Sequence, residues 1–581
     1  MTNTEVARVF EDVADLLEIQ GADVFRVNAY RRVARTINDL AVDINEIAQR
    51  GELAKLPGVG KSSADKIQEL LSTGRLRARD ELTREIPETL LELRDIPGVG
   101  PKKIALLWRE CQVRSLAELK QCIDAGGLSG IKGLGEKTIQ QMREGIEFIE
   151  RSAGRVRLGI AHAIANSVCE TVLALPGVRR VERAGSLRRG CETVGDLDLL
   201  CVADDPEAAI RGLTQMPGVT HVSAAGRTKG SVLLEYQPRR SIQIDLRVVP
   251  EESFGAAWQY FTGSKAHNVR LRELAVKHGW SLNEYGLTEG PRVIAAATEE
   301  EIYAALGVPC FPPELREDRG EFELRETPPD LLQLADIRGD LHVHTTASDG
   351  LNTAEEMIAA ARARGYAYVC IADHSPSSTI ANGLSPERLL EQIEMIRGLA
   401  RRARGITVWV GSEVDIRPDG SLDYADELLA KLDFVIASIH AGMGHDREAN
   451  TRRTLAAIEN PYVNVIGHPT GRLIGKRDAM PLDIEVVCRA AARSGTALEI
   501  NASHMRLDLK DQHARLAREM GVTICIDTDA HSIDEYEEMQ FGVMTARRAG
   551  LRRADVLNTW PADAIAKFVQ AKRNYKPAHT R

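Results

Sequence analysis

Between residues 339 and 531 the chain repeats one pattern seven times: an apolar run that meets a side chain of the kind that binds metals. Each run is rich in Val, Ile, Leu or Tyr, and helix-like stretches separate the runs. The runs are GDLHVHT (339–345), YAYVCIADHS (366–375), ITVWVGSEVDI (406–416), LDFVIASIHAG (432–442), YVNVIGHPTGR (462–472), TALEINAS (496–503) and VTICIDTDAH (522–531). Strands alternating with helices predict a parallel barrel, which gathers its strand ends at the C-terminal face.

The side chains at the ends of these runs predict a metal site with several ions. One such His alone would by default be a core or surface residue, but the joint pattern makes that reading untenable for the set. The candidate ligands are His342, His344, Asp349, His374, Glu413, His440, His468, Asp529 and His531. Imidazole and carboxylate groups suit Zn²⁺, Mn²⁺ or Fe²⁺ and do not distinguish among them. Nine ligands can hold two or three ions and leave positions for water and phosphate.

Length and composition set the broad class of the protein. A chain of 581 residues is too long for one core and predicts several domains. No apolar run approaches about 18 residues, so we expect no membrane span. Nine Cys without a CxxC pair favour a reducing compartment such as the cytoplasm. The formal charge of −9 means that any binding of DNA must come from local sites.

A short glycine motif occurs three times in the first 150 residues. The copies are LPGVGKSSADKI (56–67), IPGVGPKKIALL (96–107) and IKGLGEKTIQQM (131–142). Each predicts a tight turn followed by a helix, whose N-terminal N–H groups favour an anion. One copy alone could equally be an αα-hairpin with glycine caps. Three copies favour the helix-hairpin-helix, which grips a DNA backbone phosphate without reading sequence. The expected DNA-binding glycines are Gly58, Gly60, Gly98, Gly100, Gly133 and Gly135.

Three carboxylates in the middle of the chain form a second candidate metal site. Asp196 and Asp198 lie two apart in the strand-like run GDLDLL, so their side chains share one face. Asp245, in IQIDLRVV, lies on another strand-like run. Carboxylates gathered in this way repel one another unless cations lie between them. Three of them around a pair of Mg²⁺ ions suit an in-line displacement at phosphorus.

The segment GSLRRG (185–190) followed by GDLDLL (195–200) resembles the nucleotidyltransferase signature of the family X DNA polymerases, the DNA polymerase beta type. YFTGSKAHN (260–268) also resembles that family. The resemblance implies that Ser186, Arg189 and Gly195 lie at the phosphates of an incoming nucleotide. It further implies that Tyr260, Phe261 and Gly263 flank its sugar and that Asn268 contacts the base edge. The palm cofactor is expected to be Mg²⁺ or Mn²⁺, and the partners are gapped or nicked DNA and dNTPs.

Members of that family begin with a small helical domain that carries a deoxyribose-phosphate lyase lysine. Lys66 lies at the matching distance from PGVG, and Lys61 could help to lower its pKa. Ser62 replaces a second lysine of the lyase pocket, so lyase activity is less well supported than polymerisation. Gln243 stands where an Arg is usual near the third Asp, and Lys265 replaces an acidic residue.

The C-terminal pattern resembles the PHP domain (polymerase and histidinol phosphatase), a (β/α)7 barrel that hydrolyses phosphoesters. Arg472, after His468, is a candidate phosphate contact. The whole chain thus resembles the bacterial family X polymerases: a multidomain α/β fold with helix-hairpin-helix domains, a palm with a thumb, and a barrel. The expected parts are a lyase-like domain (1–85), fingers (86–154), palm (155–258), thumb (259–315), a Pro-rich linker or strap (316–335) and the PHP domain (336–581).

The combined prediction is a gap-filling DNA polymerase joined to a metal-dependent 3′-5′ exonuclease, abasic-site endonuclease or 3′-phosphatase of base excision repair. We expect a monomer in the cytoplasm, associated with the nucleoid. Two alternatives remain open at this point. One is a small-molecule phosphatase of the histidinol-phosphate class, and the other is a DNA-binding scaffold with an inactive palm.

Overall fold

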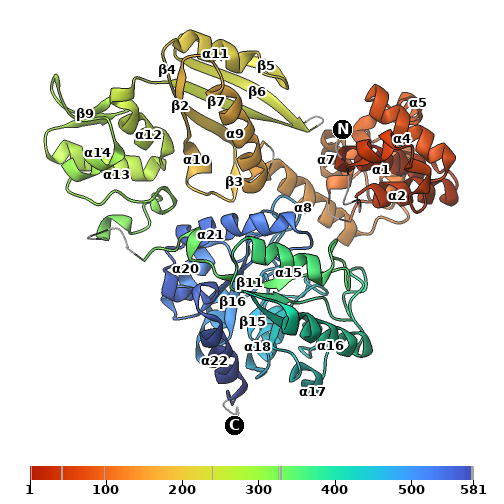
Figure 1. Cartoon of the computed structure of the whole chain (residues 1–581). Helices are drawn as coiled ribbons and strands as arrows, with labels where there is room; N and C mark the ends of the chain where they lie inside the picture. Colours follow the sequence, from red (N-terminus) through yellow and green to blue (C-terminus); the bar gives the residue numbers. More distant parts are fainter. Residues whose placement is uncertain are drawn as a thin grey trace. The chain divides into compact units, whose positions relative to one another are not determined.

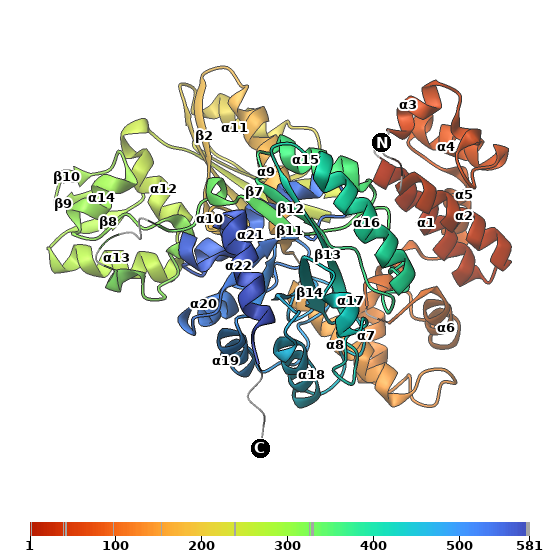
Figure 2. The same ribbon diagram turned by 60° about the horizontal axis from the view of Figure 1, so that its bottom comes forward.

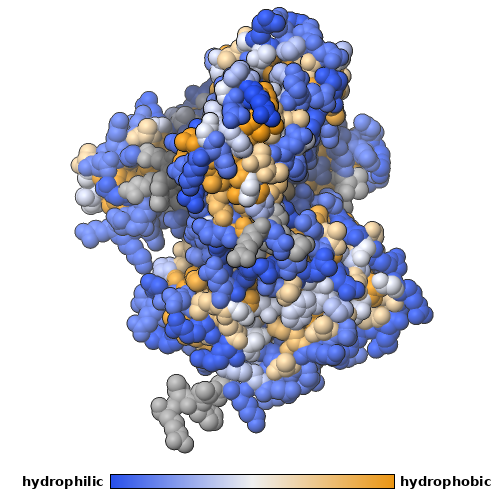
Figure 3. Space-filling view, turned by 90° about the vertical axis from the view of Figure 1, so that its left-hand side faces the viewer, coloured by the Kyte–Doolittle hydropathy of each residue, from blue (hydrophilic) through white to orange (hydrophobic). Residues whose placement is uncertain are grey.

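The computed structural model describes residues 1, 3–38, 40, 43–96, 98–152, 154–237, 240–324, 326 and 330–576. The chain divides into two compact units, Met1–Ala153 with Gly475–Arg477, and Gly154–Ile474 with Asp478–Arg581. All nine cysteines are free. Among the described helices, none is long and apolar enough to cross a membrane. The face drawn in Figure 3 is mainly hydrophilic, with smaller hydrophobic patches.

The first unit is helical (Figure 1). Its core forms where the apolar faces of successive helices meet, and it includes the rings of Phe10 and Tyr30, which are tilted by 39° with centroids 5.8 Å apart. The helices are α1 (Asn3–Gln20), α2 (Val24–Asn38), α3 (Ile44–Gln49), α4 (Lys61–Thr73), α5 (Arg77–Glu85), α6 (Pro101–Cys111), α7 (Leu116–Asp124) and α8 (Glu136–Ser152).

The three glycine motifs form the turns that the sequence predicts. Gly58, Gly98 and Gly133 have positive φ values of 73°, 75° and 100°, which the absence of a Cβ permits. Gly60 and Gly100 are the N-caps of α4 and α6. The second glycine of each of these two turns therefore places free backbone N–H groups at a helix start.

A five-stranded sheet with strand order β2-β4-β7-β6-β5 forms the middle of the chain. Helices α9 and α11 pack on one face of this sheet through a shared apolar core. The opposite face of β4 packs Leu200 and Val202 against a further helix, α12. The elements are β1 (Val156–Arg157), α9 (Leu158–Leu173), β2 (Val178–Arg183), α10 (Gly185–Arg188), β3 (Thr193–Val194), β4 (Asp196–Ala203), α11 (Pro206–Thr214), β5 (Val219–Ala225), β6 (Lys229–Gln237) and β7 (Arg240–Val248).

The sheet is followed by a small helical region with a three-stranded antiparallel sheet. Its elements are α12 (Phe254–Thr262), α13 (Lys265–Lys277), β8 (Ser281–Asn283), β9 (Gly286–Glu289), β10 (Arg292–Ala295) and α14 (Glu299–Ala305). The segment after α14 packs closely on this region: Arg316 is 1% exposed and Glu321 accepts a 2.8 Å hydrogen bond from buried His267. These contacts favour the strap over the free linker, while residues 325 and 327–329 lie outside the described residues.

Glu299 joins this strap to the central sheet. Its carboxylate contacts Arg188 of α10 at 2.7 and 2.8 Å and Arg316 at 2.5 and 3.1 Å. Burial alone would raise the pKa of Glu299, but Arg316 and Arg188 outweigh it and lower the pKa to about 2. Removing a buried carboxylate that lies between two guanidinium groups strongly destabilises a protein, because both cations lose their anionic partner.

We expect Glu299→Gln to lower the thermal unfolding midpoint at pH 7, at a cost of roughly 3–5 kcal/mol. A depressed carboxyl pKa contributes stability above about pH 4.5, and this contribution is lost as the pH falls towards about 2. The difference in unfolding midpoint between wild type and Glu299→Gln should therefore become smaller as the pH falls below about 4.5. Thermal unfolding at pH 7, 4.5 and 3.5 measures it, with exposed Glu300→Gln as the control. Equal unfolding midpoints of wild type and Glu299→Gln at pH 7 would contradict the stabilising role of Glu299.

Seven parallel strands, in chain order, form a nearly closed barrel in the last part of the chain (Figure 2). A bridge between Val343 and Ala530 links the first strand to the segment after the last. The strands are β11 (Gly339–Val343), β12 (Tyr368–Ile371), β13 (Thr407–Asp415), β14 (Phe434–Ser438), β15 (Val465–Ile466), β16 (Ala497–Asn501) and β17 (Ile524–Asp527). The helices are α15 (Ala354–Ala363), α16 (Pro386–Arg402), α17 (Asp426–Leu429), α18 (Arg447–Glu459), α19 (Ile484–Ser494), α20 (Asp511–Glu519), α21 (Met539–Arg548) and α22 (Ala562–Arg573).

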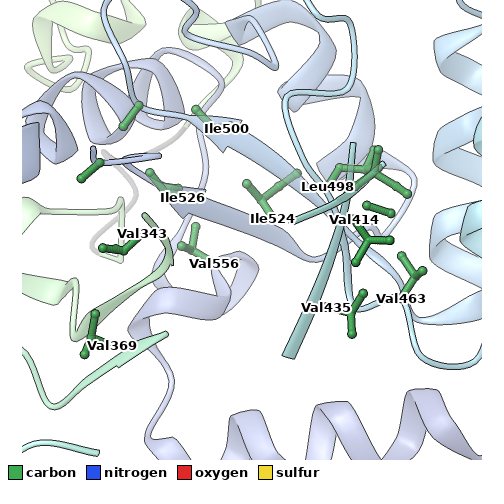
Figure 4. Packing of buried hydrophobic residues seen from close by; sticks show 14 of the residues in the cluster. Val343, Val369, Val414, Val435, Val463, Leu498, Ile500, Ile524, Ile526 and Val556 are labelled. Carbon is green, nitrogen blue, oxygen red and sulfur yellow. The ribbon is translucent and has the colours of Figure 1, made fainter. Parts of the chain in front are cut away.

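The barrel strands are apolar on both faces, as expected for a parallel sheet that is covered on both sides. On β14, Val435 belongs to the large core shared with the surrounding helices, part of which Figure 4 shows. The next residue, Ile436, belongs to a smaller core that also contains Ile565 and Val569 of α22. This alternation follows from the period of two along a strand. The predicted multidomain α/β fold with a (β/α)7 barrel is confirmed.

Candidate functional site

The three predicted carboxylates lie close together on two neighbouring strands of the central sheet. Strands β4 and β7 pair in parallel with Asp198 opposite Asp245. Asp196 shares the face of Asp198, and ligand atoms of all three lie within 4.8 Å of one another. Gln243, a departure from the family pattern, donates 3.2 Å hydrogen bonds to both oxygens of Asp245. In this structure the glutamine therefore orients the third carboxylate.

The surroundings of Asp198 disfavour its negative charge when no cation is bound. Burial, followed by the charges of Asp196 and Asp245, raises the pKa of Asp198 to about 7. The preceding turn comes very close to this carboxylate, because Gly185 has a φ of 60° and no side chain. A Cβ on Gly185 would overlap the Asp198 carboxylate and lie 3.2 Å from its Cγ. Three clustered carboxylates, of which Asp198 has a raised pKa, suit a site for divalent cations.

We expect Gly185→Ala to displace the Asp198 carboxylate and to lower nucleotide incorporation at a gap by about 100-fold, since 1 Å of misplacement can cost that much. The rate of single-nucleotide gap filling measures the effect. Gly177→Ala is the matched control, because Gly177 also has a positive φ of 77° but its Cβ would meet Asp204 only at 3.5 Å. A similar loss of gap filling in Gly185→Ala and Gly177→Ala would mean that backbone strain, and not displacement of the Asp198 carboxylate, causes the effect.

The residues assigned by resemblance to the nucleotide phosphates lie in α10, just after it and just before β4, and Arg189 has partners of its own. Arg189 donates to Glu317 Oε1 at 3.0 Å and also to the carbonyl of Thr262. Ser186 lies in the same short helix, α10, as Gly185. A Cβ on Gly195 would come within 3.3 Å of the Arg155 guanidinium.

The YFTGS turn lies at the end of α12. The rings of Tyr260 and Phe261 make an edge contact with centroids 5.1 Å apart. The Asn268 amide donates to the Tyr260 carbonyl at 2.8 Å and accepts from Gln259 at 2.7 Å. Gly263 has a φ of 71° and forms the turn between these residues and α13. The Asn268 side chain thus holds the turn in place in this structure.

The nine predicted ligands of the barrel gather at the carboxyl ends of its strands. His342 lies within β11 and Glu413 within β13, while the others follow their strands by one to a few residues. Eight of the nine fall into three overlapping groups whose ligand atoms lie within 4.8 Å of one another. The groups are His344 with Asp349, His374 and His531; His342 with His344, Glu413 and Asp529; and His374 with Glu413 and His440. The ninth, His468, lies with its Nε2 2.8 Å from Glu413 Oε1.

Glu413 is the centre of this cluster. It is 1% exposed, and five imidazoles surround its carboxylate. Burial alone would raise the pKa of Glu413, but the imidazoles of His440 and His374 help to lower it well below its ordinary value. Burial and neighbouring imidazoles lower the pKa of His344 to about 3, which keeps that ring neutral and able to bind a metal.

The barrel cluster contains buried polar atoms that make no hydrogen bond among the described residues. They are His342 Nε2, both ring nitrogens of His344, His374 Nδ1, Glu413 Oε2 and Asp529 Oδ1. Buried polar groups are normally hydrogen-bonded, so a set of metal-ligand atoms that approach one another without making hydrogen bonds fits bound cations. Asp529 and His468 also have positive φ values of 57° and 25°, a strain that is typical of functional sites.

Two buried carboxylates next to the ligands were not predicted from the sequence. Glu499 on β16 lies with Oε1 2.7 Å from His342 Nδ1, and its other oxygen accepts the backbone N–H of His468 at 2.5 Å. Asp415 lies 3.0 Å from His440 Nδ1. Carboxylates in these positions orient metal-binding imidazoles. The available signal was an acidic residue inside an apolar run: the Glu of TALEINAS and the last Asp of GSEVDI.

Lys66 is half-buried on α4, six residues after Gly60 of the first glycine hairpin. Its ammonium donates to the Ser62 hydroxyl at 2.7 Å and lies 5.9 Å from the ring centre of Tyr30. Ser62, which stands in place of a second lysine, is therefore a hydrogen-bond acceptor for Lys66. The lyase role expected for Lys66 stays a prediction.

Four parts of the chain match known domain families. Residues 1–76 match a helix-hairpin-helix domain, and residues 90–147 match the SAM-like helix-hairpin-helix tandem. Residues 257–317 match the DNA polymerase beta thumb, and residues 340–503 match the PHP domain.

Similar proteins cover either the whole chain or one end of it. "DNA polymerase/3'-5' exonuclease PolX" of Bacillus subtilis is 36% identical over 576 residues, 99% of this chain and 100% of that protein. A probable phosphatase of a Thermoanaerobacter species is 33% identical over 245 residues, which are 40% of this chain and 95% of the relative. DNA polymerase lambda of Rattus norvegicus is 29% identical over 54% of this chain and 56% of its own length. Identity over the full length of both chains, with the four domains in this order, shows that the chain belongs to the family X DNA polymerase/3′-5′ exonucleases that carry a C-terminal PHP domain.

Proposed function

We propose that this protein fills short gaps in DNA at the central carboxylate triad and trims the DNA 3′ end at the barrel cluster. The observation that carries this proposal is the presence of two separate metal-type centres on one chain that also has three glycine hairpins. One centre suits addition of a nucleotide, and the other suits hydrolysis of a phosphoester. Together they provide a repair enzyme that both prepares and extends a primer end.

In the central site, Asp196, Asp198 and Asp245 would hold Mg²⁺ or Mn²⁺. Bound there, the ions would supply charge stabilisation for displacement at phosphorus. Arg189, once drawn from Glu317, would bind the nucleotide phosphates with Ser186 and Gly195, since a guanidinium can hold phosphate bidentately. The turn formed by Tyr260, Phe261 and Gly263 would flank the sugar, and Asn268 would contact the base edge.

In the barrel, the nine residues from His342 to His531 would hold two or three Zn²⁺, Mn²⁺ or Fe²⁺ ions. Bound there, the ions would acidify water and polarise the phosphoester. Glu499 and Asp415 would keep His342 and His440 turned towards the ions. The trimming activity is proposed as a 3′-5′ exonuclease, with abasic-site endonuclease and 3′-phosphatase as further reactions at the same site.

The glycine hairpins would bind backbone phosphates of gapped or nicked duplex DNA through Gly58, Gly60, Gly98, Gly100, Gly133 and Gly135. Lys66 would act as the lyase amine on a 5′-deoxyribose phosphate. We assign residues 1–85 to the lyase-like domain, 86–154 to fingers, 155–258 to palm, 259–315 to thumb, 316–335 to the strap and 336–581 to the PHP domain. We further infer a monomer that works in the cytoplasm at the nucleoid.

A direct test uses one duplex with a single-nucleotide gap and a 3′ mismatch at the primer end. With Mn²⁺ and labelled dNTP, the protein should first shorten the primer and then incorporate the complementary nucleotide. No incorporation on a matched primer would reject the palm as a polymerase and favour a DNA-binding scaffold.

The likeness of the barrel to a probable phosphatase favours one second candidate, a small-molecule phosphatase. Histidinol phosphate and a 3′-labelled oligonucleotide, assayed at equal concentration, separate the two. Rapid release of phosphate from histidinol phosphate without trimming of the oligonucleotide would support the phosphatase.

A further inference from the structure

Arg506 lies on the turn between β16 and α20, beside the barrel cluster. Its Nε is 3.7 Å from Asp529 Oδ2, and its side chain is 19% exposed. The residue is at the carboxyl end of the barrel, where all the candidate ligands gather. Neither the ligand pattern nor the family resemblance assigns it a role.

The guanidinium of Arg506 lies next to the cluster, and one of its nitrogens has no hydrogen-bond acceptor among the described residues. Its Nη1 is buried and makes no hydrogen bond among the described residues. The 3.7 Å separation from Asp529 is an ion-pair contact, longer than a hydrogen bond. A guanidinium has five donors, and a buried charged donor without an acceptor is costly. The arrangement therefore favours an anionic ligand that supplies the missing acceptor.

Arg472, the sequence candidate for a phosphate contact, is already engaged. Its Nε donates to the Arg506 carbonyl at 2.8 Å, and an Nη group donates to the Leu507 carbonyl. The remaining Nη lies 2.7 Å from Glu192. Arg472 thus fixes the backbone of the turn that carries Arg506, and each of its three nitrogens has a partner.

The turn itself is held firmly. Leu507 is fully buried with a φ of 42°, a conformation that a branched side chain adopts only under constraint. Asp508 accepts the backbone N–H of Thr470 at 2.9 Å, and its carbonyl accepts the backbone N–H of Asn501 at 2.6 Å. A binding group held on a rigid turn loses little conformational freedom when its ligand arrives.

We propose that Arg506 binds the phosphate group of the substrate at the barrel site, through the non-bridging oxygens of the phosphodiester that is cleaved. This inference rests on the proposed trimming function and names a residue that contacts its substrate. A guanidinium matches two phosphate oxygens at once and stabilises the negative charge that grows on them during hydrolysis. Arg472 is then a positioning residue for Arg506.

The test uses the full-length protein with Mn²⁺ and compares wild type with Arg506→Met and Arg506→Lys. On a 3′-labelled oligonucleotide, Arg506→Met should lower kcat/KM for trimming by roughly 100-fold, as for other removed charge-stabilising donors. Inorganic phosphate should bind at least about tenfold more weakly, as measured by calorimetry, since one charged hydrogen-bonding group is lost. Arg506→Lys should recover part of both losses, because it keeps the charge without the fork.

Metal content and gap filling should be unchanged in both variants. Arg515→Met is the control, because Arg515 makes a surface ion pair with Glu519, 3.1 Å away on the same helix. Unchanged trimming and phosphate binding in Arg506→Met would overturn the inference. A loss of bound metal large enough to explain the losses of trimming and of phosphate binding would also overturn it. If wild type binds metal but does not trim DNA, the proposed function fails, while the phosphate titration still tests Arg506.

Discussion

Asp198→Asn is expected to reduce incorporation at a single-nucleotide gap by at least about 1000-fold while 3′-end trimming continues at the wild-type rate. Asp198 lies opposite Asp245 on the paired strand and on the same face as Asp196, so it is the central member of the triad. Asparagine keeps the shape but removes the charge that a divalent cation needs. The barrel ligands come from other elements, β11 to β17, so hydrolysis there does not depend on this carboxylate.

The measurement is the rate of labelled dNMP incorporation with Mg²⁺ or Mn²⁺, next to trimming of a 3′-labelled strand by the same preparation. Asp204→Asn is the matched control, because Asp204 follows the same strand and its side chain is 70% exposed. Incorporation by Asp198→Asn above a tenth of the wild-type rate would argue against the triad as the polymerising centre.

Glu413→Gln is expected to have the opposite effect: loss of trimming by at least about 1000-fold, with unchanged gap filling. Glu413 belongs to two of the three ligand groups of the barrel. Its Oε1 lies 2.8 Å from His468 and 3.4 Å from His440, and its Oε2 lies 2.8 Å from His374. The substitution removes the charge shared by those groups, so the metal content of the purified protein should fall as well.

Elemental analysis of the purified protein and a trimming assay measure the two effects separately. Asp419→Asn, in the exposed loop after β13, is the control. His344→Ala is a second test, because His344 belongs to the group that does not contain Glu413 as well as to one that does. Full metal content together with normal trimming in both Glu413→Gln and His344→Ala would show that the cluster is not the hydrolytic site.

Much of the site was predictable because its signals are local. Each barrel strand is a short apolar run, and for six of the seven strands, all but β16, the predicted ligands stand within the strand or shortly after it. Sequence order therefore already lists the ligands. The glycine turns were predictable for the same reason, since a positive φ such as that of Gly98 favours glycine at one position. Asp196 and Asp198 share a face through the period of two alone.

The partners of long polar side chains were not predictable. Arg472 and Arg506 both lie near candidate ligands in the sequence. Arg472 was the predicted phosphate contact because it follows His468 closely. In the fold, Arg472 is satisfied by two carbonyls of the 506–507 turn, and Arg506 has an unpaired nitrogen near Asp529. Likewise, the contact of Arg189 with Glu317 joins residues 128 positions apart.

The sequence by itself determined the kinds of local feature in this protein: a seven-strand barrel with imidazole and carboxylate ends, a carboxylate triad, and three glycine turns. Periodicity, turn conformation and ligand type are properties of short segments, so they can be read before folding. The tertiary structure decided which side chains are left with free donors and acceptors. That depends on contacts between distant segments, as in the pairing of Glu499 with His342 and in the orientation of Arg506.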